Sequence, residues 1–333
     1  QAGDYTVESD RQKVMGMLRG AMDVHITYLR KRKMHDLFRF YTARYHQLLG
    51  LPHAERSPEE FLATFGFETM EQAVKASGMT GLGCAAMAGD TSMVRMLLEA
   101  KAQLSKRHPN LAEVDQLPGQ TPFHFAVLRG IESADVITEL LRWRADPNVT
   151  CDMGMPVFSH CKDPETVELL VSHRGDVNRR SGLIHNTALA VCCCKLAPVP
   201  VLAKLLELRA DPNLSQGGES TTPLTAMVFY TKGLSRYAVE VAGLLVRARA
   251  DVNQAQRASG VWRFAELVCR ASQRCGKDSA LIRYFAENSS TPLGIAAYYA
   301  NEPMVSFLLS ARADVNHRNH RGHTPLMLAG ERP

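Results

Sequence analysis

A five-residue phrase, Arg-Ala-Asp-x-Asn with small variations, returns along this chain. A recurring phrase marks copies of one supersecondary unit, and such units have to stack because none of them buries its apolar face alone. The fold is therefore limited to a solenoid or a related array. The copies are Arg144–Asn148, Arg174–Asn178, Arg209–Asn213, Arg249–Asn253 and Arg312–Asn316, with a divergent copy at Lys101–Ser105.

A second phrase, Thr-Pro-Leu and its variants, recurs upstream of the first. It begins at Thr80, Thr121, Thr187, Thr222, Thr291 and Thr324. The offset from Thr291 to Thr324 is 33 residues, which is the period of ankyrin repeats with their Thr-Pro-Leu-His-x-Ala signature. Over roughly residues 69–331, the chain therefore resembles the ankyrin-repeat family.

This resemblance implies an all-α fold, an ankyrin-repeat solenoid of helix-loop-helix units with short finger hairpins. It also implies a protein–protein interaction scaffold or adaptor, which binds a partner along the concave face and the finger loops. Small residues such as Ala85 and Ala86 on a first helix, and leucine pairs such as Leu97 and Leu98 on a second helix, fit this layout. We expect a monomer with a protein partner and no small-molecule substrate.

Two stretches depart from the regular spacing. Pro156 to Asp176 is 20 residues, against 22 from Pro292 to Asp314, so we predict a shortened first helix in the third unit. Residues 254–290 add 37 residues where the corresponding connector, 214–221, has eight. This surplus is either a degenerate repeat or a helical insert grown from a finger loop, and its length, close to one repeat, favours the degenerate repeat.

The sequence divides into three regions. Residues 1–56 form a basic N-terminal helical region, and residues 57–79, which open on a Ser-Pro-Glu-Glu capping box, form a helical N-terminal capping unit. Residues 80–333 form the ankyrin-repeat domain. The chain begins at Gln1 and stops one helix into a further unit, so an alternative is a regulatory or targeting segment of a larger enzyme or channel.

The positive charge of the chain is concentrated near its N-terminus. Arg11–Arg44 carries nine basic and two acidic residues, a net charge of +7, whereas the remaining chain has 30 basic and 32 acidic residues, a net charge of −2. Two interpretations of this basic helix are open. It could be an electrostatic adaptor that binds acidic membrane or nucleic acid, or its charges could form an ordinary solvated helix face, and we favour the solvated face. Its densest cluster is Arg30, Lys31, Arg32 and Lys33.

A basic residue precedes Ala-Asp or Gly-Asp in the repeated phrase, where the ankyrin family typically has a glycine that ends the second helix in a left-handed conformation. These cations either pair with the aspartates two residues further on, the alternative we favour, or form a docking edge for an acidic partner. The last finger is also basic. The candidate partner-binding residues are Arg144, Arg209, Arg249, Arg312, His317, Arg318, His320 and Arg321.

Catalytic and metal-binding motifs are missing from the sequence. It contains no nucleophile elbow, phosphate loop, zinc-protease helix or kinase signature, so we predict no enzyme and no cofactor. Histidines at 317, 320 and 323 have no Cys near in sequence, and three histidines do not by themselves complete a four-ligand zinc site. The eight cysteines form no Cys-x-x-Cys pair, which indicates an intracellular protein, cytoplasmic or nuclear.

Overall fold

The computed structural model describes residues 80–100, 120–152, 154–180, 187–214, 221–231, 235–255, 290–319 and 322–330. The predicted N-terminal helical region and capping unit, and with them the Arg30–Lys33 cluster, lie outside these ranges. The described helices are α3 (Gly81–Ala88), α4 (Thr91–Glu99), α5 (Pro122–Arg129), η2 (Ile131–Ser133), α6 (Ala134–Arg142), η3 (Val157–His160), α7 (Pro164–Ser172), α8 (Ala188–Cys194), α9 (Val199–Glu207), α10 (Pro223–Tyr230), α11 (Ser235–Arg247), α14 (Pro292–Tyr298), α15 (Glu302–Ser310) and α16 (Pro325–Gly330).

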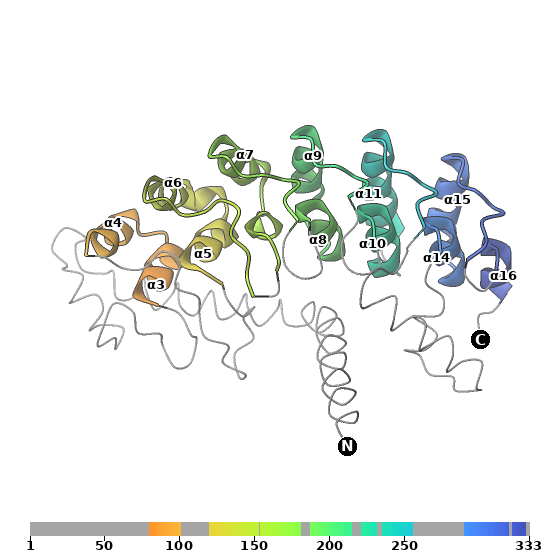
Figure 1. Cartoon of the computed structure of the whole chain (residues 1–333), viewed down its shortest axis with the longest axis horizontal. Helices are drawn as coiled ribbons and strands as arrows, with labels where there is room; N and C mark the ends of the chain where they lie inside the picture. The colour runs from red at the N-terminus through yellow and green to blue at the C-terminus, as the bar shows by residue number, and fades with distance from the viewer. Residues whose placement is uncertain are drawn as a thin grey trace, which may run out of the picture.

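The helices form two rows along an arch (Figure 1). The first helices α3, α5, α8, α10 and α14 make the inner row, and the second helices α4, α6, α7, α9, α11 and α15 make the outer row. First helices pack on their own second helices, as α3 does on α4, and helices of one row pack on their neighbours in the next unit, as α8 does on α10 and α9 on α11. No helix within the described ranges is long and apolar enough to cross a membrane.

The Thr-Pro-Leu phrase starts the first helices. The hydroxyl of Thr222 accepts a hydrogen bond from the N–H of Thr225 at 3.2 Å, and the proline that follows it occupies the first helical position. There the missing proline N–H costs nothing, because that group has no partner within a helix. The same cap is made at Thr80, Thr187 and Thr291. The phrase is therefore a helix-start signal that recurs along the stack, and the third unit, with Met155-Pro156 at this place, lacks it.

One continuous apolar core runs through the stack. Small side chains on the first helices let neighbouring units approach closely, and one leucine on each second helix closes the core beneath them. The small residues of the first helices include the fully buried alanines Ala85, Ala126, Ala190, Ala226 and Ala296. The leucines at this position, all fully buried, are Leu97, Leu140, Leu170, Leu205, Leu245 and Leu308.

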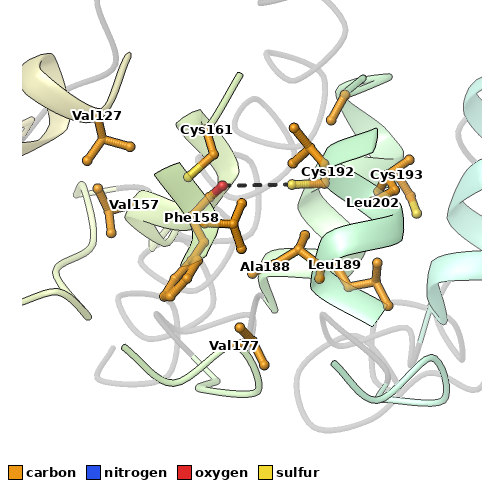
Figure 2. Close-up of a cluster of buried hydrophobic side chains, with 14 of the residues drawn as sticks. Val127, Val157, Phe158, Cys161, Val177, Ala188, Leu189, Cys192, Cys193 and Leu202 are labelled. Carbon is orange, nitrogen blue, oxygen red and sulfur yellow. Dashed lines mark hydrogen bonds between the residues drawn. The ribbon is translucent and has the colours of Figure 1, made fainter. Parts of the chain in front are cut away.

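The third unit has a single 3₁₀ turn, η3, where the others have a first helix, as the short spacing predicted. Phe158 of η3 is 1% exposed and lies between the core residues of α5 and those of α8 (Figure 2). The thiol of Cys192 donates a long hydrogen bond, 4.0 Å from sulfur to oxygen, to the carbonyl of Phe158. An aromatic ring thus fills the volume that a longer helix occupies in the neighbouring units.

The asparagine that ends the repeated phrase joins each unit to the next. The side-chain amide of Asn178 donates to the carbonyl oxygen of Arg209 at 2.9 Å, and its oxygen accepts from the N–H of Asp211 at 2.7 Å. Asn148 and Asn213 make the same pair of bonds to the units that follow them. We call this series the asparagine ladder.

The asparagine ladder continues directly across the 254–290 stretch. Asn253 accepts a hydrogen bond from the N–H of Asp314 at 2.7 Å, although 61 residues separate them. In the same way α10 packs on α14, and α11 packs on α15. Most of 254–290 lies outside the described residues, but the units on either side of it touch each other. These contacts favour the helical insert over the degenerate repeat, because a repeat within the stack would separate the two units.

Replacing residues 254–290 with the eight-residue connector 214–221 is expected to leave the solenoid folded, because the flanking units already contact each other without the insert. We expect one cooperative thermal transition with a Tm within about 3 °C of the unchanged chain. Circular dichroism melting of both proteins measures this. Two separate transitions, or a Tm lowered by about 10 °C, would show that the stretch is part of the stack.

Candidate functional site

Five arginines end the second helices in the same left-handed conformation. We call Arg144, Arg174, Arg209, Arg249 and Arg312 the arginine row, and their φ angles lie between 63° and 70°. At Arg209 the backbone N–H donates to Leu206 O at 3.0 Å, and that of Ala210 donates to Leu205 O at 2.9 Å. This is a Schellman motif with arginine at the position that glycine usually holds. The other four arginines make the same pair of bonds.

The side chains of the arginine row are exposed, and the predicted pairing with the neighbouring aspartates is wrong. No ion pair within the described part of the chain joins an arginine of the row to an aspartate of the phrase. Instead, the carboxylate of Asp211 accepts from the backbone N–H of Asn213 at 2.8 Å. The other four aspartates accept from their own asparagine in the same way. Each carboxylate is held within its own turn.

The arginine row is uninterrupted along the outer row of helices. Arg249 and Arg312 are 63 positions apart in sequence but follow α11 and α15, which pack on each other. Adjacent members are therefore one unit apart throughout, about 8–10 Å for packed helices. The asparagine ladder fixes this spacing, because it bonds to the carbonyls of Arg174, Arg209 and Arg249 and, in the last unit, to the N–H of Asp314.

The last finger is closed by backbone and asparagine contacts. The side chain of Asn319 accepts from the N–H of His323 at 3.0 Å, and a guanidinium nitrogen of Arg318 donates to Gly322 O at 2.9 Å. His317 is half-buried. Two further candidates, His320 and Arg321, lie outside the described residues. Within the described ranges, no group of three His, Cys, Asp or Glu residues is placed to hold a metal ion.

A second set of side chains was not anticipated from the sequence. Arg129, Lys195, Phe229, Tyr298 and Tyr299 are half-buried near the ends of first helices, and we call them the inner set. Arg129 donates to the carbonyls of the preceding unit, Met87 and Ala88, at 3.0 and 2.9 Å. The rings of Phe229 and Tyr299 meet edge to face with centroids 5.9 Å apart. The inner set is thus basic toward the N-terminal units and aromatic toward the C-terminal ones.

A cluster of polar side chains connects the second, third and fourth units. His160 of η3 lies 3.1 Å from the amide nitrogen of Gln120, and its ring meets His124 of α5 edge to face at 5.4 Å. Lys195, at the end of α8, donates to the hydroxyl of Ser159 at 3.2 Å. Burial lowers the pKa of His160 well below its usual value, and the charge of Lys195 and the ring of His124 lower that pKa further. His160 is therefore neutral in the folded protein at pH 7.

The stability of the protein is expected to fall as the pH is lowered from about 7 to about 5. Unfolding exposes His160 to water, where its pKa returns to about 6.5. Below that pH the unfolded chain binds a proton that the folded chain excludes, which lowers the free energy of unfolding by up to about 1.4 kcal/mol per pH unit. Urea titrations across this range measure the slope. The His160→Gln variant should show a shallower slope, and equal slopes would contradict the assignment.

Several of the described cysteines fill small, buried apolar positions. Cys192 and Cys193 are fully buried on α8. Burial raises the pKa of Cys84 to about 12 and that of Cys193 well above its usual value. Since the thiolate is the nucleophile and the metal ligand, a thiol with so high a pKa takes part in neither reaction at pH 7.

Comparison with known proteins identifies the structural class of this chain. The Ankyrin repeat family model matches residues 118–152 and 288–320. The structure is similar to the ankyrin repeat domain of Bcl-3, described as a unique member of the IkappaB protein family, with a TM-score of 0.53 and 22% identity over 76% of this chain and 95% of that one. The chain therefore has the ankyrin-repeat fold, and its resemblance to ankyrin-repeat proteins is confirmed.

Among individual proteins, the chain is similar to Ankyrin repeat and SOCS box protein 6 from Homo sapiens, with 33% identity over 124 residues. The protein of the same name from Pongo abelii is 32% identical over 124 residues. The match covers 36% of this chain and only 28% of each relative. What these comparisons establish is a repeat class whose members are generally protein–protein interaction modules and typically non-catalytic.

Proposed function

We propose that this chain is a protein-interaction scaffold or adaptor that holds a partner along the first helices and the fingers. The observation that supports this proposal is the inner set. Its side chains come from four units, and the rings of Phe229 and Tyr299 meet across a unit boundary. Aromatic side chains supply large contact areas at a small entropic cost, and arginine and aromatic residues are enriched where proteins bind one another.

Site-specific photo-crosslinking in cells tests this proposal. A photoreactive phenylalanine analogue at Tyr298 should form adducts with a partner protein, and the same analogue at Glu165 serves as the matched control. Glu165 is exposed on α7, in the outer row of helices, and is not a member of the inner set. Adducts from position 298 and none from position 165 are expected. Equal adducts at both positions, or adducts at 165 alone, would contradict the inner set as the binding surface.

A second candidate function rests on the N-terminal charge. The net +7 of Arg11–Arg44 supports an electrostatic adaptor that binds acidic membrane or nucleic acid. Binding of the intact chain to vesicles with and without anionic lipid, and to duplex DNA, over a salt series tests this candidate. Retained affinity at high salt, or no binding at low salt, would reject it. A role as the regulatory segment of a larger protein stays a prediction, as do the monomeric state and the cytoplasmic or nuclear location.

A further inference from the structure

The arginine row occupies a conformation that arginine does not favour. Left-handed backbone brings the Cβ atom of an L-residue close to the following carbonyl, which costs roughly 1–2 kcal/mol, and glycine avoids this cost. A cation at a helix C-terminus recovers about 0.3–1 kcal/mol from the helix dipole. Arginine therefore offers the fold no net advantage over glycine here. Strained positions that recur are a reason to look for a function.

No interaction within the described part of the chain explains the guanidinium groups. The phrase aspartates bond to backbone N–H groups of their own turns. The arginine backbone carbonyls, not the side chains, take part in the asparagine ladder. The five side chains remain exposed along one edge of the solenoid. Their use is therefore to be sought outside the molecule.

The charge of this edge favours an acidic partner. Five segments, which start at the ends of the second helices and run one to three residues past the phrases, contain ten arginines and six carboxylates. Outside Arg11–Arg44, by contrast, the chain carries a net charge of −2. The edge is thus a positive strip on an otherwise acidic solenoid. Its residues are 141–149, 171–180, 206–214, 246–254 and 309–319.

The spacing of the arginine row selects the conformation of the partner. Adjacent arginines follow adjacent units, about 8–10 Å apart. A polyproline II segment has three residues per turn and rises about 3.1 Å per residue, so every third side chain lies on one face at about 9.3 Å. A β-strand does not match the arginine spacing. Its side chains on one face recur at every second residue, which at about 3.3 Å per residue is a shorter distance than that between adjacent arginines. Guanidinium groups also bind carboxylates through two parallel hydrogen bonds.

We propose that the arginine row is a docking edge for an extended acidic peptide in polyproline II conformation, with Asp or Glu at every third position. The row lies along the outer helices, so this edge is distinct from the inner set, and either surface can fail without the other. The asparagine ladder holds the backbone of the row in place, which reduces the entropy lost on binding. Each contact is an ion pair at an exposed surface, so affinity depends on salt and on several contacts made together.

Fluorescence anisotropy with labelled peptides tests the docking edge. The probe is a peptide of Glu-Pro-Pro triplets, one for each arginine, and its control has the same composition with the glutamates placed consecutively. At low salt the full chain should bind the triplet peptide about tenfold more tightly than the control, because only the triplet peptide matches the row. Equal affinities for the two peptides would overturn the proposal.

Two variants distinguish binding by the arginine row from binding by net positive charge. Replacing all five row arginines with glycine should weaken binding of the triplet peptide about tenfold or more. The matched variant removes five other arginines of the same strip, Arg142→Gln, Arg179→Gln, Arg180→Gln, Arg247→Gln and Arg318→Gln. This matched variant should lose less than about threefold. Equal losses in both would overturn the proposal, because they would show binding by charge alone. A row variant changed to lysine should bind with intermediate affinity, since lysine keeps the charge without the two-pronged geometry.

Two further results would overturn the acidic peptide as the partner and indicate a different one. The first is tighter binding of oligodeoxythymidylate than of the triplet peptide, lost in the glycine variant, which would assign the row to a phosphate polymer. The second is a dimer of the wild-type chain in sedimentation that the glycine variant abolishes, which would assign the row to a second copy of this chain. A monomer that prefers the triplet peptide supports the proposal.

Discussion

Replacing Phe158 with alanine is expected to cost about 3–5 kcal/mol of unfolding free energy, the range for truncation of a buried aromatic side chain. Phe158 is 1% exposed and belongs to a unit that has only a 3₁₀ turn in place of its first helix. Its ring also contacts Gly175, where an added Cβ atom would lie 2.6 Å from the end of the ring. The other copies of the phrase have alanine at this position. The third unit thus depends on one side chain.

The loss of the Phe158 ring should also split the unfolding of the solenoid into two steps. In a repeat array, stability is a sum of unit and interface terms, so weakening one central unit uncouples the two sides. Urea unfolding of the Phe158→Ala variant should show two transitions where the wild type shows one. The Phe158→Leu variant keeps most of the volume and should retain a single transition. One transition with a loss below about 1 kcal/mol in the alanine variant would show that the ring is not the link.

Replacing Asn213 with alanine is expected to cost about 2 kcal/mol, since this change removes two hydrogen bonds between units. Its side chain joins the carbonyl of Arg249 and the N–H of Asp251, at 3.0 and 2.7 Å. Both backbone groups lose their partner in the variant. Chemical denaturation measures the loss. Hydrogen exchange should show a matching loss of protection at the Asp251 amide.

Asn316 provides a matched control for the asparagine ladder. It has the same place in the phrase, and its backbone N–H bonds to Asp314 as in the other units. Its side chain is exposed and makes no bond to a following unit within the described residues. The Asn316→Ala variant should therefore cost less than about 0.5 kcal/mol. A similar loss at both positions would mean that asparagine stabilises its own turn, and not the contact between units.

Much of the fold could be predicted from the sequence because the relevant chemistry is local. Threonine before proline caps a helix within three residues, so the start of each first helix was visible in the phrase itself. The left-handed arginines were expected, because they stand where the family has glycine. Counting residues also predicted the shortened third unit, since an ankyrin unit has a fixed length.

Other features depend on which units touch, and a sequence does not show this directly. The length of 254–290 suggested a further repeat, but the contact between Asn253 and Asp314 depends on three-dimensional packing. The expected arginine–aspartate pairing was wrong because each carboxylate closes its own turn. The inner set was missed, although the aromatic residues at 229, 298 and 299 just after the small residues of first helices were a usable signal.

In our proposal the arginine row acts outside the fold and does not stabilise it. The most direct test is the free energy of unfolding, without any partner, of the variant in which Arg144, Arg174, Arg209, Arg249 and Arg312 are all glycine. Glycine keeps the left-handed turns and relieves their strain while the helix dipoles lose a cation, so we predict a value within about 2 kcal/mol of the wild type. A loss of about 5 kcal/mol, or roughly 1 kcal/mol per arginine, would contradict this account by showing that the side chains stabilise the solenoid.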